Sequence, residues 1–83
     1  MNDSTKGILK PAYDRLTEKI GEYERLKLYY QNRLQMVRSL HPIQDVGTLE
    51  NHQEWIQSIE NIIENYENRI RILKENKILI SLA

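Results

Sequence analysis

The sequence predicts an all-α fold: an antiparallel two-helix hairpin of the coiled-coil type that dimerises into a four-helix bundle. In both halves of the chain, apolar residues recur at alternating spacings of three and four, which is the period of a coiled-coil seam. The two series are mirror images of each other about one point, between Val46 and Gly47. That point falls in a stretch typical of a loop, so we expect residues 1–83 to form a single helical hairpin domain.

The first helix is predicted over about residues 10–40. Pro11 suits its first turn, because the amide hydrogen that proline lacks would have no intrahelical acceptor there. The polar residues before it are expected to fray. The helix should end before Pro42, since proline disfavours helical geometry in the residue that precedes it. The seam of this helix consists of Tyr13, Leu16, Ile20, Tyr23, Lys27, Tyr30, Leu34, Val37 and His41.

We predict a loop over residues 41–47 and a second helix over about residues 48–80. Pro42, Asp45 and Gly47 supply the residue types that loops favour, and Thr48 is the expected N-cap of the second helix. Basic residues gather toward the end of this helix, where they complement its dipole. Its seam consists of His52, Ile56, Ile59, Ile63, Tyr66, Ile70, Leu73, Lys77 and Ile80.

Folding the chain at the mirror point defines one register for the whole hairpin. Tyr30 then lies opposite Ile63, and Leu34 lies opposite Ile59. Two lysines interrupt the apolar seam, and lysines at such positions usually set the register or the oligomeric state. Glu67 is next to the layer of Lys27 and could accept a charge-assisted hydrogen bond from it. The predicted register-setting polar core consists of Lys27, Tyr66 and Lys77.

A second apolar stripe flanks the seam in the loop-proximal half of the hairpin. One seam between two helices buries too little apolar surface to offset the entropy of ordering both helices, so this stripe needs a partner. A second copy of the hairpin is the most economical partner. The alternative is that a different protein covers the stripe, and dimerisation then uses the loop-distal Ile72, Leu79 and Leu82. The register places Leu40 beside Trp55 and Arg33 beside Ile62. The predicted contact surface consists of Leu26, Tyr29, Arg33, Met36, Leu40, Trp55 and Ile62.

The bulk composition favours a soluble cytoplasmic protein. The 12 lysines and arginines are balanced by 12 aspartates and glutamates, so the charge favours neither nucleic acid nor an anionic membrane. No run approaches the roughly 18 apolar residues of a membrane span, and the polar start does not resemble a signal peptide. The chain has no cysteine and is rich in Ile, Asn and Lys, a bias typical of AT-rich bacterial or phage genomes.

Motifs for chemistry are weak throughout the chain. No nucleophile with a base, paired carboxylates or phosphate loop is present, so we expect no enzymatic activity and no cofactor. His41 and His52 share a predicted layer near Asp45, but two histidines separated by a loop are a weak signal for zinc, and we expect no metal. The basic residues of the first helix fall at different heptad positions and do not form one nucleic-acid-binding stripe: Arg25, Lys27, Arg33 and Arg38.

The sequence therefore predicts a non-enzymatic protein–protein interaction module. We expect a homodimeric helical hairpin that binds and modulates a partner protein, in the manner of a bacterial or phage regulator, inhibitor or antirepressor. A DNA-associated regulator is one alternative, and an assembly or secretion-chaperone subunit is another. No motif indicates the identity of the partner.

Overall fold

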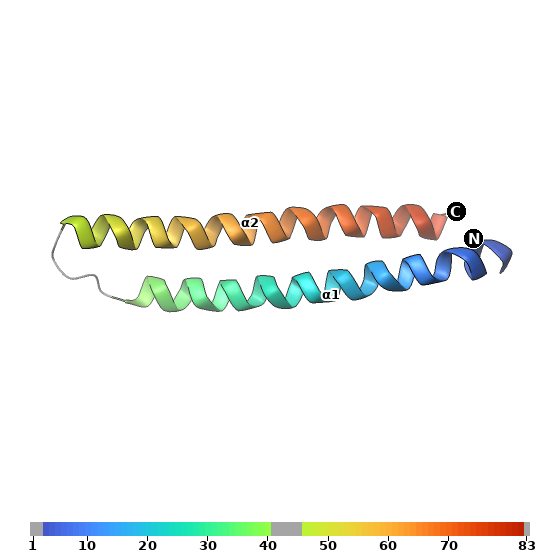
Figure 1. The fold of residues 1–83 in the computed structure, drawn as a ribbon, viewed down its shortest axis with the longest axis horizontal. Coiled ribbons are helices and arrows are strands. Elements are labelled where there is room, and N and C mark those ends of the chain that lie inside the picture. Colours follow the sequence, from blue (N-terminus) through green and yellow to red (C-terminus); the bar gives the residue numbers. More distant parts are fainter. Residues whose placement is uncertain (1–2, 41–45, 83) are drawn as a thin grey trace.

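The chain folds into two long helices that lie side by side and run in opposite directions (Figure 1). The computed structural model describes the backbone of residues 3–40 and 46–82 and the side chains of residues 9–40 and 51–82. Helix α1 spans Asp3–Ser39 and helix α2 spans Val46–Leu82. The overall dimensions of 65 × 14 × 12 Å are those of a rod two helices wide. The predicted all-α hairpin is confirmed.

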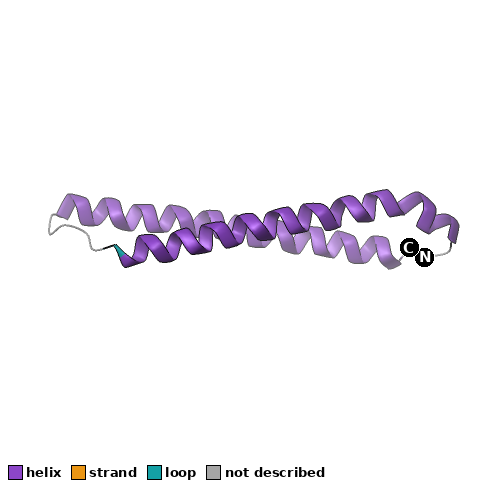
Figure 2. Ribbon diagram, turned by 90° about the horizontal axis from the view of Figure 1, so that it is seen from below, coloured by secondary structure: helices purple, strands orange, loops and turns teal. Residues whose placement is uncertain are grey.

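Helix α1 begins earlier than predicted. It starts at Asp3 rather than at about residue 10, so Pro11 lies inside the helix and not in its first turn. A proline inside a helix removes one backbone hydrogen bond and crowds the carbonyl four residues before it, which bends the helix or ends it. Figure 2 shows that α1 bends close to its N-terminal end and continues.

Helix α2 also begins before its predicted start. It starts at Val46 rather than at about residue 48, and it ends at Leu82 rather than at about residue 80. Gly47 and Thr48 are therefore in its first turn, and the expectation that Thr48 is the N-cap is wrong. The first amides of a helix have no intrahelical acceptor in any case, so a first turn tolerates poor helix formers. As a result, α2 extends past the end of α1 on the loop side (Figure 1).

The core lies along the predicted seam. Every seam position among the described side chains is buried or half-buried. The buried residues are Ile20, Val37, Ile59, Ile63 and Ile70. Val37, Ile59 and Ile63 form one cluster, and Tyr30 and Leu34 pack against it. These contacts agree with the predicted layers that pair Tyr30 with Ile63 and Leu34 with Ile59.

A run of tyrosines continues the seam toward the middle of the rod. The Tyr66 ring lies between Tyr23 and Tyr30, with ring centroids 5.6 and 5.9 Å away. Tyr23 and Tyr30 are neighbours of Lys27 on the α1 seam, so Tyr66 sits at the height of Lys27. This is the layer in which the mirror symmetry of the sequence places it.

Candidate interaction surface

The ammonium groups of both lysines of the predicted polar core lie at the edge of the seam, each near a side chain of the other helix. The Nζ atom of Lys27 lies 3.7 Å from Oε1 of Glu67, and the Lys27 side chain is 30% exposed. The Nζ atom of Lys77 lies 4.8 Å from the centroid of the Tyr13 ring. In both cases the aliphatic stem fills the seam while the charge stays close to water, which is how amphipathic side chains avoid the cost of desolvation.

Replacing Lys27 by leucine should raise the thermal stability. A partly exposed ion pair contributes about 0–1 kcal/mol, whereas a leucine at a half-buried position gains about 1–2 kcal/mol of apolar burial. We expect Lys27→Leu to raise the melting temperature by about 4 °C or more and to yield a mixture of oligomeric states in sedimentation velocity, because a polar seam residue sets the oligomeric state. Lys27→Gln, which removes only the charge, is the control. A lower melting temperature for Lys27→Leu would show that the ion pair contributes more than the leucine.

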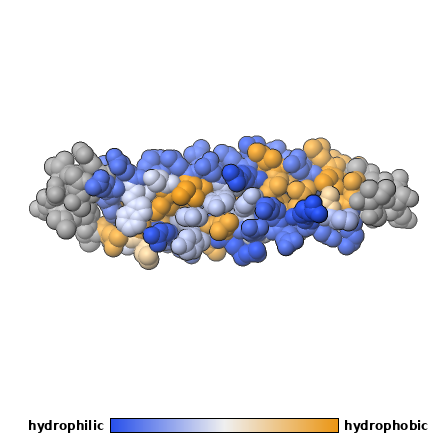
Figure 3. Space-filling view, in the orientation of Figure 1, coloured by the Kyte–Doolittle hydropathy of each residue, from blue (hydrophilic) through white to orange (hydrophobic). Residues whose placement is uncertain are grey.

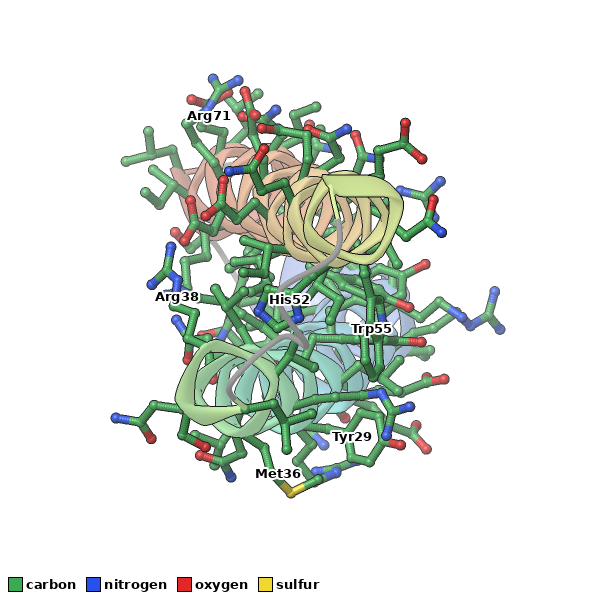
Figure 4. The ribbon with its side chains drawn as sticks, turned by 90° about the vertical axis from the view of Figure 1, so that its left-hand side faces the viewer. Tyr29, Met36, Arg38, His52, Trp55 and Arg71 are labelled. Atoms are coloured by element: carbon green, nitrogen blue, oxygen red, sulfur yellow. The ribbon has the colours of Figure 1, made fainter. Side chains whose placement is uncertain are left out.

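Ion pairs between the two helices gather on one flank of the hairpin, which we call the ion-pair flank. Nζ of Lys74 lies 3.1 Å from Oε1 of Glu24, and Arg38 pairs with Glu60. Their spacing in multiples of seven puts these residues on the same side of each helix, together with Glu67. Viewed from the loop end, Arg38 and Trp55 lie on opposite sides of the plane that contains the two helices (Figure 4).

The opposite side, which we call the apolar flank, carries the predicted contact surface. Leu26 and Ile62 are half-buried there, and the other five side chains are exposed. The exposed fraction is 41% for Trp55 and 60% for Met36. Figure 4 shows Trp55 and Tyr29 on the same side of the hairpin, whereas Met36 lies on the outer side of α1, away from α2. The surface is therefore curved, with Met36 at its edge.

Arg33 differs from its predicted placement. Its guanidinium lies over the Trp55 ring, 5.9 Å from the ring centroid. The register pairs Arg33 with Ile62, which is about two turns of α2 farther from the loop. The long side chain of Arg33 reaches along the surface to the indole, because the face of a tryptophan attracts a cation. The adjacency of Arg33 to Trp55 depends on a rotamer that the heptad spacing does not specify.

The predicted contact surface does not include a second group of exposed apolar residues, three of which form the alternative dimerisation surface predicted at the loop-distal end. The C-terminal part of α2 exposes Ile72, Ile78, Leu79 and Leu82, and α1 exposes Leu28. Figure 3 shows apolar side chains gathered at this end of the rod. The seven-residue spacing of Ile72 and Leu79 places both on the apolar flank, in line with the stripe near the loop.

Two shallow grooves lie on the apolar flank. One lies near the middle of the rod and is lined by Ile62, Asn65, Tyr66 and Arg69. The other lies near the chain ends, and its lining consists of Ala12, Arg15, Leu16, Asn76, Leu79 and Ile80. Apolar side chains beside such grooves can accept the ridge of side chains on another helix.

The remaining chemistry-bearing residues do not converge. Within residues 9–40 and 51–82, no three histidine, cysteine, aspartate or glutamate side chains lie close enough to hold a metal ion. His52 is half-buried, and the other members of the predicted histidine layer, His41 and Asp45, lie outside the described residues. Neither described helix holds a segment long and apolar enough to cross a membrane.

The comparisons with known proteins give no relative for this chain. No protein-family model, curated protein or solved structure matches it. The features that bear on function are therefore the two flanks of the hairpin: one with ion pairs that join the helices, and one with most of the exposed apolar and aromatic side chains.

Proposed function

We propose that this chain is a non-enzymatic protein-interaction module, a homodimeric helical hairpin that binds and modulates a partner protein. Its contact surface is the apolar flank. The class of protein that fits is a cytoplasmic bacterial or phage regulator, inhibitor or antirepressor. Aromatic residues and arginine are the usual anchors of protein interfaces, and Trp55, Tyr29 and Arg33 lie on this flank.

The observation that carries the proposal is the amount of surface that the single hairpin leaves exposed. Its accessible surface is 6440 Å² for a mass of 9.9 kDa. A compact globular monomer of this mass exposes about 5,200 Å². The excess of about 1,200 Å² is larger than the roughly 800 Å² per partner that a standard protein interface buries. Covering one flank with a second hairpin would remove an excess of this size.

The alternative of a DNA-associated regulator receives less support from the side chains. Arg38 is engaged by Glu60, and Lys27 lies close to Glu67. Arg33 lies over Trp55, and Figure 4 places Arg38 on the side opposite to Trp55. Phosphate binding needs several cations that face one way. Arg33 and Arg69 share the apolar flank, but Leu26 and Ile62 lie between them, so we do not propose DNA as the ligand.

Dilution tests the homodimer. One seam between two helices buries too little apolar surface to offset the entropy of ordering both helices. We therefore expect the wild-type chain to sediment as a dimer and to lose helicity, measured by circular dichroism, as it dissociates at low micromolar concentration. The same ellipticity per residue at all concentrations, together with a monomer mass of 9.9 kDa, would contradict the proposal. Affinity capture from the source cell, with Trp55→Glu as the negative control, then tests for the partner protein.

A further inference from the structure

We infer that the second copy of the hairpin covers the apolar flank with its loop at the opposite end, so that α1 packs on α1 of the partner subunit and α2 packs on α2 of the partner subunit. This inference rests on the proposed homodimer and adds its geometry. It commits to one symmetric arrangement, in which the two-fold axis is perpendicular to the long axis of the rod and crosses the middle of the hairpin.

The apolar flank of α2 has the period of a second seam. Its positions recur at spacings of three and four, as do those of the intramolecular seam, but they are rotated by about a quarter turn around the helix. One apolar pair, Trp55 and Ile62, lies toward the loop end of this flank, and the other, Ile72 and Leu79, lies toward the chain end. Polar residues lie between the two pairs. In order along the chain, the positions are Trp55, Ser58, Ile62, Asn65, Arg69, Ile72, Asn76 and Leu79.

In one antiparallel pairing of α2 with α2 of the partner subunit, each of the four apolar residues of this series faces an apolar residue of the other copy. When the pairing is centred on Glu67, Trp55 faces Leu79 of the partner subunit and Ile62 faces Ile72 of the partner subunit. The same pairing brings polar residues together, because Ser58 then faces Asn76 of the partner subunit. A shift by one heptad in either direction places an isoleucine opposite Asn65 or Arg69 of the partner subunit. The α2 flank is therefore self-complementary in one register.

The residues of α1 on the apolar flank define the centre of their own antiparallel pairing, independently of α2. Antiparallel pairing about the point between Lys27 and Leu28 brings Leu26 against Tyr29 of the partner subunit. It also brings Arg33 to Glu22 of the partner subunit, which is an attractive charge pair. Nearer the ends, Met36 and Leu40 meet Lys19 and Arg15 of the partner subunit, whose aliphatic stems can cover them.

The two centres fall at nearly the same height along the hairpin, because the register places the α1 centre about 1.5 residues, or about 2 Å, from Glu67. The α1 centre is next to Lys27 and the α2 centre is Glu67, and these two side chains form the 3.7 Å ion pair that joins the helices. A single two-fold axis therefore serves both helices at once. With the loops at the same end, Leu26 would instead face Arg69 of the partner subunit and Leu79 would face Arg15 of the partner subunit. That arrangement would form none of the apolar pairs Leu26–Tyr29, Ile62–Ile72 and Trp55–Leu79.

The groove near the chain ends has an occupant in this arrangement. Leu79 lines that groove, and Trp55 of the partner subunit is the residue paired with Leu79. Trp55 is 41% exposed and Leu79 is 65% exposed in the single hairpin. The dimer thus places the largest side chain of the flank in the apolar groove of the partner subunit, once at each end of the bundle.

Disulfide cross-linking tests the arrangement, because the chain has no cysteine of its own. Ser58 and Asn76 are exposed and polar, so their replacement removes no apolar contact. They are about 27 Å apart on one helix, at 1.5 Å per residue, which is too far for a disulfide within one chain. We expect Ser58→Cys with Asn76→Cys to convert most of the protein to a covalent dimer under mild oxidation. Each single variant should stay non-covalent.

A matched pair of cysteines tests the rival geometry. With the loops at the same end, residue 58 would lie against residue 36 of the partner subunit, so Met36→Cys with Ser58→Cys would cross-link instead. If this second pair cross-links and the protein sediments as a dimer, the inferred arrangement is wrong but the proposed homodimer is supported. A chain that sediments as a monomer at high concentration would overturn both. Covalent dimers from either single variant would also contradict the arrangement.

Discussion

The double variant Trp55→Glu with Ile62→Glu is expected to be monomeric and to lose at least about half of the helical signal of the wild-type chain at 222 nm. Both residues lie on the apolar flank, and Ile62 is half-buried even in the single hairpin. Burying an ionised carboxylate without a partner costs several kcal/mol, so the variant cannot form the dimer. The hairpin then depends on its single seam, which buries too little apolar surface to offset the entropy of ordering both helices. Sedimentation equilibrium and circular dichroism on the same samples measure both effects.

The matched control adds the same two charges on the opposite side of the molecule. Gln35 and Gln57 are exposed, and their heptad positions place them on the ion-pair flank. Gln35→Glu with Gln57→Glu should therefore remain a dimer with nearly the helicity of the wild-type chain. If the flank variant stays a folded dimer but no longer captures a partner protein, the apolar flank is the binding site for that protein and not the dimer interface. If it retains both, the flank has neither role.

The seam and its register could be predicted from the sequence because both follow from periodicity. An α-helix that packs on one neighbour must present its apolar residues along one face, and an antiparallel fold fixes which residue meets which once the mirror point is known. The cluster of Val37, Ile59 and Ile63 and the place of Tyr66 between Tyr23 and Tyr30 agree with that register. No information beyond the spacing was needed.

The helix ends and the extent of the exposed surface were harder to predict. Whether a helix continues through Pro11, or starts at Val46 or at Thr48, depends on one or two hydrogen bonds. The free-energy difference between such helix ends is too small to be predicted from the local propensities of the residues. The main contact surface was predicted near the loop, and Ile72 and Leu79 were predicted only as part of an alternative dimerisation surface. Ile72 and Leu79 belong to the same flank, but they are separated from the stripe by Arg69, so the two groups do not form one unbroken apolar run.

Placing an aspartate at Val37 should unfold the chain. Val37 is 2% exposed, which makes it the most deeply buried residue of the core, and it packs in one cluster with Ile59 and Ile63. A carboxylate there has no cation within the cluster, so Val37→Asp should cost about 4 kcal/mol or more, which is comparable to the whole stability of a small domain. We expect a random-coil circular dichroism spectrum at 25 °C and no cooperative thermal transition.

The same substitution at Leu28 distinguishes the seam from the surface of the same helix. Leu28 is 57% exposed, and its heptad position places it on the ion-pair flank, outside both the intramolecular seam and the inferred dimer interface. Leu28→Asp should therefore cost only the helix propensity of aspartate, about 0.5 kcal/mol, and should leave the dimer mass unchanged. Unfolding of Leu28→Asp would mean that the ion-pair flank is also covered by protein. A folded Val37→Asp would mean that α1 packs through another face, and the register deduced from the two seams would then be wrong.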